Sequence, residues 1–338
     1  MGVGPMHLAR FPRRRYTSGE TPMERLPRFS QAVGGPDIYI KRDDLLGLTG
    51  GGNKTRKLEF LVADALAKGA DTLITCGGIQ SNHCRLTLSA AVKEGMHCWL
   101  VLTEAEPGAY RPDANGNIFL FQLLGAERIK LVGDGVDTWA ELSTAAAEAT
   151  AAGRRPYIIP MGGSNAVGAL GYVACAEELM GQCFETGLRL DHVVLAGGSA
   201  GTLAGLWLGF GGNRLDVPLT AISVLNPKEK LRDEAREIAR AAAELLGAAA
   251  AVDEELLTCG DEYIGPGYAQ PTPEMIEAVR LLARTEGVLL DPIYTGKAMA
   301  GLIDLAHQGV FRPGEKVLFL HTGGVPGLYA LTGLFTGS

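Results

Sequence analysis

A lysine that follows a run of glycines is the residue in this sequence best placed to do chemistry. Residues 50–52 are glycines that precede Asn53 and Lys54, and the apolar spacing of an amphipathic helix follows. Lys54 is therefore expected in the first helical turn, where the helix dipole and the neighbouring Arg56 and Lys57 disfavour an ammonium ion. A free lysine has a pKa of about 10.4, so a lowered pKa predicts an amine that reacts at neutral pH. The alternatives are a solvated lysine and a Walker A loop, and the latter is disfavoured because Asn53 separates the last glycine from the lysine.

Further glycine-rich segments follow short β-branched runs. They are residues 76–83, 161–165, 197–202 and 321–324. In parallel sheets, ligands bind outside the carboxyl ends of the strands, where loops lead into helix N-termini. We therefore expect these loops to converge on one crevice.

Polar groups in two of these loops are suited to anions. Residues 197–202 connect a buried strand to a helix, so their N–H groups form a nest that fits a phosphate. Gln80, Ser81, Asn82 and His83 open another helix and offer donors for a carboxylate. A structural turn and simple N-capping by Ser81 are the alternatives.

A tyrosine also precedes a predicted helix. Tyr294 stands next to that helix N-terminus, where a phenolate is favoured, so it is a candidate proton donor or acceptor. An ordinary half-buried tyrosine with a bonded hydroxyl is the alternative.

Composition narrows the class of protein. The chain has 338 residues, 46% of them hydrophobic, a net charge of −7 and a pI near 5.5. This balance argues against nucleic acid as a partner and favours a small-molecule substrate. No apolar run is long enough to cross a membrane, so we expect a cytoplasmic protein. The six cysteines and six histidines lack the spacing of disulfide frameworks or metal sites, which predicts reduced thiols and no metal.

Strand patterns such as 192–196 and 316–320 alternate with helical patterns such as 81–94 and 166–183. This alternation predicts an α/β protein with parallel sheets covered on both faces. We expect residues 53–164 to form a smaller domain within a larger domain made of residues 1–52 and 165–338.

The motifs at residues 41–44, 51–54, 80–83, 198–202 and 294–297 occur together and in order. With them, the sequence resembles pyridoxal phosphate (PLP) enzymes of the tryptophan synthase β-subunit fold class. The resembling branch holds D-cysteine desulfhydrase, aminocyclopropane-carboxylate (ACC) deaminase and L-cysteate sulfo-lyase. The resemblance runs from residue 6 to residue 324 and implies fold type II, with two open, twisted, mostly parallel sheets. It also implies PLP as cofactor, a small amino acid as substrate, and a homodimer. The larger domain would then bind PLP, and the smaller domain would lie on the substrate side.

The same resemblance implies roles for single residues. Lys54 would link covalently to the cofactor, Asn82 would contact its ring hydroxyl, and Thr322 would face its pyridine nitrogen. The implied cofactor contacts are Lys54, Asn53, Asn82, Gly198, Ser199, Ala200, Gly201, Thr202 and Thr322. The implied substrate contacts are Gln80, Ser81, Asn82 and His83, and the implied catalytic residues are Lys54, Ser81 and Tyr294.

The resemblance points to an α,β-elimination in which Lys54 removes the Cα proton. Thr295 and Thr322 stand where deaminase relatives carry glutamate and leucine, which disfavours cyclopropane ring opening. Residues 84–86 and 110–122 look closer to L-cysteate sulfo-lyase, so the expected reaction converts L-cysteate to pyruvate, sulfite and ammonia. D-cysteine desulfhydration, which yields sulfide instead, is the alternative. His83 and Arg111 are candidates to hold a sulfonate.

Three positions near the phosphate loop depart from the family pattern. They are Gly197, Leu203 and Asn226. They leave open a second class of function, a non-catalytic PLP-binding or sensing protein. The sequence retains Lys54 and Tyr294, the candidate groups for proton transfer, and this argues against the non-catalytic class.

Overall fold

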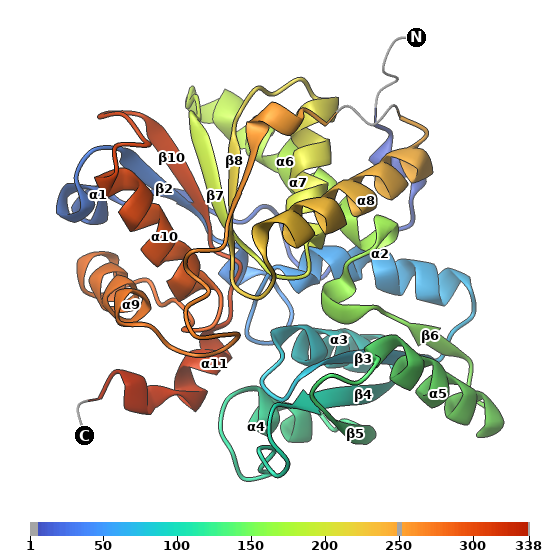
Figure 1. The fold of residues 1–338 in the computed structure, drawn as a ribbon. Helices are drawn as coiled ribbons and strands as arrows, with labels where there is room; N and C mark the ends of the chain where they lie inside the picture. The colour runs from blue at the N-terminus through green and yellow to red at the C-terminus, as the bar shows by residue number, and fades with distance from the viewer. Residues whose placement is uncertain (1–5, 249–251, 337–338) are drawn as a thin grey trace.

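The computed structural model describes residues 6–248 and 252–336 of the chain. It contains two β-sheets, each covered by helices on both faces, and the strands of one sheet lie below those of the other in Figure 1. The α/β class with two mostly parallel sheets, expected from the sequence, is confirmed.

The larger sheet has six strands in the order β1-β2-β10-β7-β8-β9. All neighbouring pairs are parallel except β1 with β2. Its strands are β1 (Met23–Arg25), β2 (Asp37–Lys41), β7 (His192–Gly197), β8 (Leu219–Ser223), β9 (Leu257–Gly260) and β10 (Lys316–Leu320). Strands β2, β7 and β10 are neighbours, so the loops that follow them start at one edge of the sheet.

The smaller sheet has four parallel strands in the order β5-β4-β3-β6. They are β3 (Thr72–Gly78), β4 (His97–Glu104), β5 (Arg128–Gly133) and β6 (Pro156–Ile158). Strand β3 is buried along most of its length, as expected for an inner strand covered on both faces.

Helices cover both faces of each sheet and bury separate apolar clusters. Helices α1, α9 and α10 pack on one face of the larger sheet, and α6, α7 and α8 pack on the other. Helices α2 and α3 cover one face of the smaller sheet, and α5 covers the opposite face. The bounds are α1 (Pro27–Val33), α2 (Lys54–Ala67), α3 (Asn82–Glu94), α4 (Asn117–Leu123), α5 (Thr138–Ala151), α6 (Ala166–Thr186), α7 (Gly201–Gly212), α8 (Lys228–Leu246), α9 (Pro273–Glu286), α10 (Thr295–His307) and α11 (Val325–Ala330).

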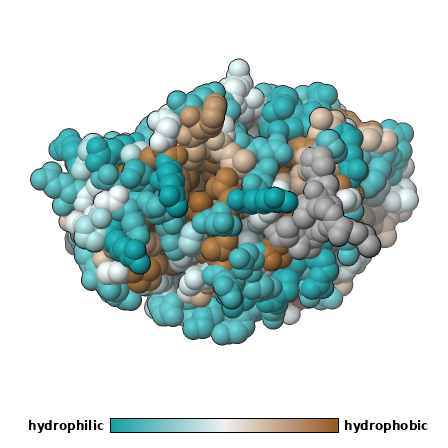
Figure 2. Space-filling model, turned by 90° about the horizontal axis from the view of Figure 1, so that it is seen from above, coloured by the Kyte–Doolittle hydropathy of each residue, from teal (hydrophilic) through white to brown (hydrophobic). Residues whose placement is uncertain are grey.

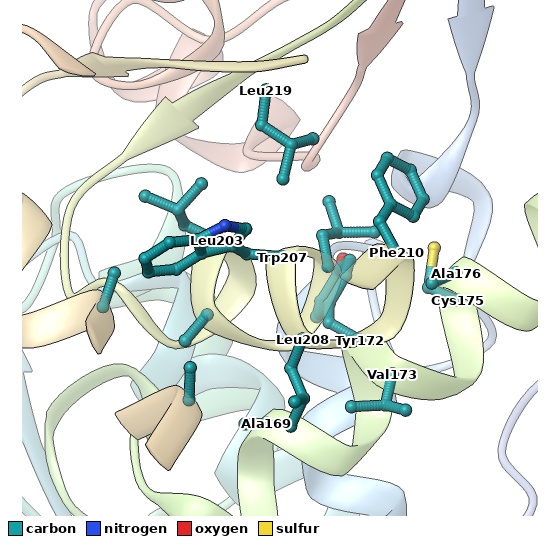
Figure 3. Close-up of a cluster of buried hydrophobic side chains, with 14 of the residues drawn as sticks. Ala169, Tyr172, Val173, Cys175, Ala176, Leu203, Trp207, Leu208, Phe210 and Leu219 are labelled. Atoms are coloured by element: carbon teal, nitrogen blue, oxygen red, sulfur yellow. The ribbon is translucent and has the colours of Figure 1, made fainter. Parts of the chain in front are cut away.

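Helix α7 is apolar on all sides because it lies between other elements of the larger domain core. Figure 3 shows its Leu203, Trp207 and Phe210 within the apolar cluster that it shares with α6 and β8. Glycines let α7 approach α6 closely, since a Cβ at Gly205 would lie 2.4 Å from the Ala169 carbonyl oxygen. The N-terminus of α7 is thereby held firmly at the sheet edge.

The face shown in Figure 2 is mainly hydrophilic, and its apolar residues gather chiefly around a hollow near the middle of the view. Within residues 6–248 and 252–336, the helices are too short or too polar to cross a bilayer.

The sequence predicted most elements to within a few residues. Helix α6 continues to Thr186, three residues beyond its expected end. Strands β1 and β9 were not predicted, because they are short edge strands of three and four residues. The domain division at residues 53 and 164 stays a prediction, and residues 1–5, 249–251 and 337–338 of the expected larger domain lie outside the described residues.

A buried ionic cluster joins β2, α2 and α6. Glu178 on α6 lies 2.5 Å from Lys41 Nζ and 2.7 Å from Arg56 Nη1, and Arg56 also binds Asp43 at 2.8 Å. Tyr172 donates a hydrogen bond to Asp43 at 2.6 Å. Burial alone would raise the pKa of Glu178, but the hydrogen bonds and charges of Arg56 and Lys41 outweigh it and lower the pKa to about 2.

We predict that this cluster makes stability depend on acid pH. The folded pKa of Glu178 lies below its usual value, so its contribution is present above about pH 4.3 and is lost as the pH falls toward 2. At pH 7, Glu178→Gln should lower the free energy of unfolding by roughly 3 kcal/mol. Urea denaturation should show this difference from wild type shrinking below pH 4.3. Glu185→Gln, at an exposed position on the same helix, is the control, and a difference that stays constant down to pH 3 would contradict the prediction.

Candidate active site

Asn53 connects three of the loops at the carboxyl ends of the strands. Its backbone N–H donates to the Thr322 carbonyl oxygen after β10 at 3.0 Å. Its side-chain Nδ2 donates to Thr202 Oγ1, at the start of α7, at 2.9 Å. The following residue is Lys54, the first residue of α2. The expected convergence of the loops around Lys54 is therefore present on the side of the larger sheet.

The glycines before Lys54 are required by close approaches of the backbone. Gly51 has φ +64°, and a Cβ there would lie 1.6 Å from the Asp44 carbonyl oxygen. Gly52 has φ +125° and lies against the turn after β10, since a Cβ at Gly323 would be 2.6 Å from Gly52 Cα. A side chain at either position would displace the loop that carries the lysine.

The pKa of the Lys54 amine is lowered, as the sequence predicts. Desolvation lowers its pKa to about 8, and the negative charge of Asp291 opposes the shift. Its Nζ donates to Asn53 Oδ1 at 3.1 Å. The expected contribution of Arg56 is wrong, because that guanidinium is paired with Asp43 and Glu178 in the buried cluster.

The loop after β7 meets the N-terminal half of α2. Ala200 is the N-cap of α7 and has a left-handed backbone, φ +57°, which changes the direction of successive N–H groups as in an anion nest. Gly201 packs against Lys57, because a Cβ at Gly201 would lie 2.8 Å from Lys57 Nζ. The Gly201 N–H donates to Ser164 Oγ at 3.2 Å, and Ser164 in turn donates to Ser199 Oγ at 2.9 Å.

Lys57 is a fully buried cation at this loop. Its Nζ donates to the Gly162 carbonyl oxygen at 3.0 Å and to Ser164 Oγ at 3.1 Å. Burial and then the charge of Lys54 lower the pKa of Lys57 well below its usual value. Within the described residues, no carboxylate forms an ion pair with Lys57, so the region favours an added anion.

The loop after β3 presents an oriented amide. Asn82 Oδ1 accepts hydrogen bonds from Arg85 at 2.8 Å and from Asn117 Nδ2 at 3.0 Å. In the described part of the chain its Nδ2 group has no acceptor, so it can donate to a ligand. Arg85 is buried and also donates to the Gly51 carbonyl oxygen at 2.7 Å, which ties this amide to the loop that carries Lys54.

Three candidate substrate contacts have partners within the protein. Ser81 caps α3 and accepts the Cys84 N–H at 3.1 Å, which leaves its hydroxyl able to donate. The Gln80 side chain accepts from Asn117 N at 2.8 Å and donates to the Asn115 carbonyl oxygen at 3.0 Å. The His83 ring is buried and bonds Thr75 Oγ1 at 2.7 Å.

Neither candidate for sulfonate binding presents a cation to the crevice. Burial, and then the charges of Lys54 and Lys57, lower the pKa of His83 well below its usual value, so the ring is neutral near pH 7. Arg111 is 71% exposed and lies 3.7 Å from Asp113.

Tyr294 faces a second tyrosine, Tyr268, and the two hydroxyl groups form a short hydrogen bond. Burial raises the pKa of Tyr294 well above its usual value, and desolvation raises that of Tyr268 to about 12. The expectation of a phenolate at this helix N-terminus is therefore wrong. The carboxylate of Asp291 already occupies that position, since it accepts the N–H groups of residues 293, 294 and 295 at 2.8–2.9 Å.

Thr322 lies in the turn after β10, next to Gly52 and Asn53. His321 fixes this turn: its Nε2 donates to the Leu289 carbonyl oxygen at 2.9 Å, and its Nδ1 accepts the Gly323 N–H at 3.2 Å. Burial lowers the pKa of His321, so the neutral ring serves as a donor and an acceptor at once.

Sequence reasoning missed several residues of the crevice. Tyr268 and Asp291 were given no role, and Arg85 and Asn117 were noted only within the segments at residues 84–86 and 110–122. Tyr268 lies in a glycine- and proline-rich loop whose composition was the only available signal. Its pairing with Tyr294 depends on a loop fold that spacing does not predict.

Comparisons with known proteins agree with this geometry. Residues 15–323 match the family described as "Pyridoxal-phosphate dependent enzyme". The chain is 48% identical to proteins named D-cysteine desulfhydrase from Salmonella typhimurium and Salmonella typhi, over 96% of this chain and 97% of each relative.

Solved structures give the same picture. The crystal structure of an ACC deaminase homologue superposes with a TM-score of 0.83 at 41% identity, and the match covers 95% of this chain and 94% of that one. O-ureido-L-serine synthase, at 22% identity and a TM-score of 0.68, covers 95% of each chain and shares the fold alone.

We predict that Lys54 reacts as an amine with a pKa near 8. In the cofactor-free protein, the rate of its acylation by a small reagent should rise through about pH 8. Asp291→Asn should shift the midpoint to lower pH, because the charge of Asp291 raises the pKa of Lys54. Peptide mass spectrometry measures the rate, with the exposed Lys93 as internal reference. A midpoint near pH 10 would refute the prediction.

Proposed function

The chain belongs to the family of pyridoxal-phosphate dependent enzymes, and from this premise we propose that it is a carbon–sulfur lyase that converts D-cysteine to pyruvate, sulfide and ammonia. The observation that carries the proposal is the pair of neutral tyrosines beside the loop at residues 198–202, where a Cβ at Gly198 would lie 3.7 Å from Tyr294 Cε1, together with the lowered pKa of Lys54. The identity to relatives named D-cysteine desulfhydrase supports it.

The buried cation at the α7 loop fits the phosphate of the cofactor. We propose that residues 198–202 and Lys57 hold this phosphate, because a helix N-terminus, a left-handed nest and an unpaired ammonium favour an anion at one place. The bond between Asn53 and Thr202 holds the phosphate loop beside Lys54.

The remaining polar groups fit the cofactor ring. We propose that Asn82 donates its free Nδ2 to the ring hydroxyl and that Thr322 faces the pyridine nitrogen. Bound there, the cofactor would supply an electron sink for the charge that develops at Cα. A hydroxyl at the pyridine nitrogen makes this sink weaker than a carboxylate partner would.

The protein supplies a base and a carboxylate-binding site. Lys54, with a pKa near 8, offers a usable fraction of neutral amine at neutral pH and takes the Cα proton. Ser81 and the N-terminus of α3 bind the substrate carboxylate through the hydroxyl and backbone N–H groups. Gln80 acts indirectly, because its side chain holds the loop at residues 115–117.

The tyrosine pair is suited to a thiol leaving group. Both phenols stay protonated at neutral pH, so one can donate a proton to the sulfur as the Cβ–S bond breaks. Departing sulfite would instead carry its negative charge away and would need a fixed cation, which neither His83 nor Arg111 offers. This chemistry favours D-cysteine over L-cysteate.

L-cysteate remains the second candidate substrate. It is favoured by the segment at residues 110–122, which resembles L-cysteate sulfo-lyase. The homodimer and the cytoplasmic location stay predictions.

Two of the three departures near the phosphate loop, Gly197 and Leu203, have packing explanations. Gly197 lies against Leu231, where a Cβ would come within 2.5 Å of Leu231 Cδ2, and Leu203 is buried in the core. They therefore give little support to a non-catalytic binding protein.

We predict that D-cysteine is the preferred substrate. The purified holoenzyme should release sulfide and pyruvate from D-cysteine with kcat/KM at least about tenfold above that for sulfite from L-cysteate. Steady-state assays of both products decide between them. A higher rate with L-cysteate would favour the second candidate, and no pyruvate from any β-substituted alanine would favour the non-catalytic class.

Two variants test the assigned roles. Lys54→Ala should lower kcat by about 10³-fold or more, because it removes both the covalent link and the base. Tyr294→Phe should lower kcat by about 10²-fold with KM little changed, as loss of a proton donor predicts. Circular dichroism checks that both variants fold. If Tyr294→Phe keeps the wild-type kcat, the Tyr294 hydroxyl is not the proton donor.

A further inference from the structure

Lys297 is a buried cation in the motif at residues 294–297 that the reaction leaves without a role. It lies in the first turn of α10, is fully buried, and donates to the Ile264 carbonyl oxygen at 2.6 Å and to the Gly267 carbonyl oxygen at 2.9 Å. Among residues 6–248 and 252–336 no carboxylate pairs with it, and burial lowers its pKa.

The two carbonyl groups belong to the loop at residues 261–272, which has no helix or strand. Its backbone is left-handed at Gly265, φ +68°, and at Ala269, φ +58°. Tyr268 at its tip keeps 37% of its surface exposed. Near its start, the loop is fixed by Tyr263, which packs on the core and donates to Asp304 Oδ2 at 2.6 Å, whereas the Lys297 bonds tether residues closer to Tyr268.

The same turn of α10 carries both Lys297 and Tyr294. Gly267, which Lys297 holds, is the residue directly before Tyr268. The rings of Tyr268 and Tyr294 meet edge to face with centroids 5.9 Å apart, and their hydroxyl groups are hydrogen-bonded. On its other side, Tyr268 approaches Gly78 at the end of β3, where a Cβ would be 3.9 Å away.

We propose that Lys297 is a positioning residue, which clamps the loop at residues 261–272 so that the Tyr268 hydroxyl meets that of Tyr294 in the crevice. The proposal rests on the proposed function for the role of the tyrosine pair. It explains why a lysine occupies a buried position where an apolar residue would avoid the cost of burying a charge. An ammonium can donate to both carbonyl groups at once, which methionine cannot.

Hydrogen exchange tests the clamp without substrate. In Lys297→Met, backbone amides of residues 261–272 should exchange faster than in wild type, while those of α10 and β3 stay protected. Lys228→Met is the matched control. This partly exposed lysine also reaches the loop, but only through a long ion pair, in which its Nζ lies 3.9 Å from Glu262 Oε1. Unchanged exchange in the loop would overturn the clamp whether or not D-cysteine is the substrate.

A double-mutant cycle tests the connection to the reaction. With the substrate that wild type turns over, Lys297→Met should lower kcat by roughly ten- to a hundredfold, as misplacement of a reacting group predicts. On a Tyr268→Phe background it should lower kcat little further, because both changes remove one contact. Lys228→Met should keep wild-type kcat. Equal losses on both backgrounds would refute a role through Tyr268.

A second variant covers the case in which Lys297→Met does not fold. Lys297→Gln keeps an amide that can donate to a carbonyl group but is shorter than the ammonium and uncharged, so kcat should lie below that of wild type and loop exchange should be faster. The absorbance of the bound cofactor should match wild type. A Lys297→Gln enzyme that loses cofactor, or one with wild-type kcat and loop exchange, would overturn the proposal.

Discussion

The two hydrogen bonds of Asn53 are the constraint on which the site depends. They join the residue before the reactive lysine to Thr202 at the start of α7 and to Thr322 after β10. Because β7 and β10 are neighbours in one sheet, the distance between these two anchors is set by the sheet itself. Helix α7 is packed on all sides, so it cannot move to accommodate a shifted lysine loop.

Charge placement divides the basic residues of α2 and α3 into two kinds. Arg56 is buried between Asp43 and Glu178 and holds α2 against α6. Lys54, Lys57 and Arg85 face the crevice side, and burial lowers the pKa of each. Placing paired and unpaired cations on one helix lets the same element anchor the fold and create a site that favours an anion.

The sequence predicts what local pattern controls, and it fails where folding brings loops together. The α/β class and the strand-end loops followed from periodicity and spacing. The direction of the Lys54 pKa shift was also predicted, but its largest cause is burial, which depends on the tertiary fold. The wrong expectation for Tyr294 shows the limit: the helix N-terminus suggested a phenolate, but Asp291 already caps that turn. Tyr268 lies 26 residues before its partner and in an irregular loop, so no local pattern could pair them.

The segment at residues 110–122 illustrates why resemblance of a segment is weak evidence for a leaving group. In the structure Asn117 contacts Asn82 and both ends of Gln80, and Gly116 packs against Gln80 and the Pro326 carbonyl oxygen. The segment therefore acts through the orientation of the Asn82 amide, which we propose to contact the cofactor ring. Its sequence is free to follow that packing, whereas the choice between thiol and sulfonate depends on the groups that face Cβ, which in our proposal are the neutral hydroxyl groups of the tyrosine pair.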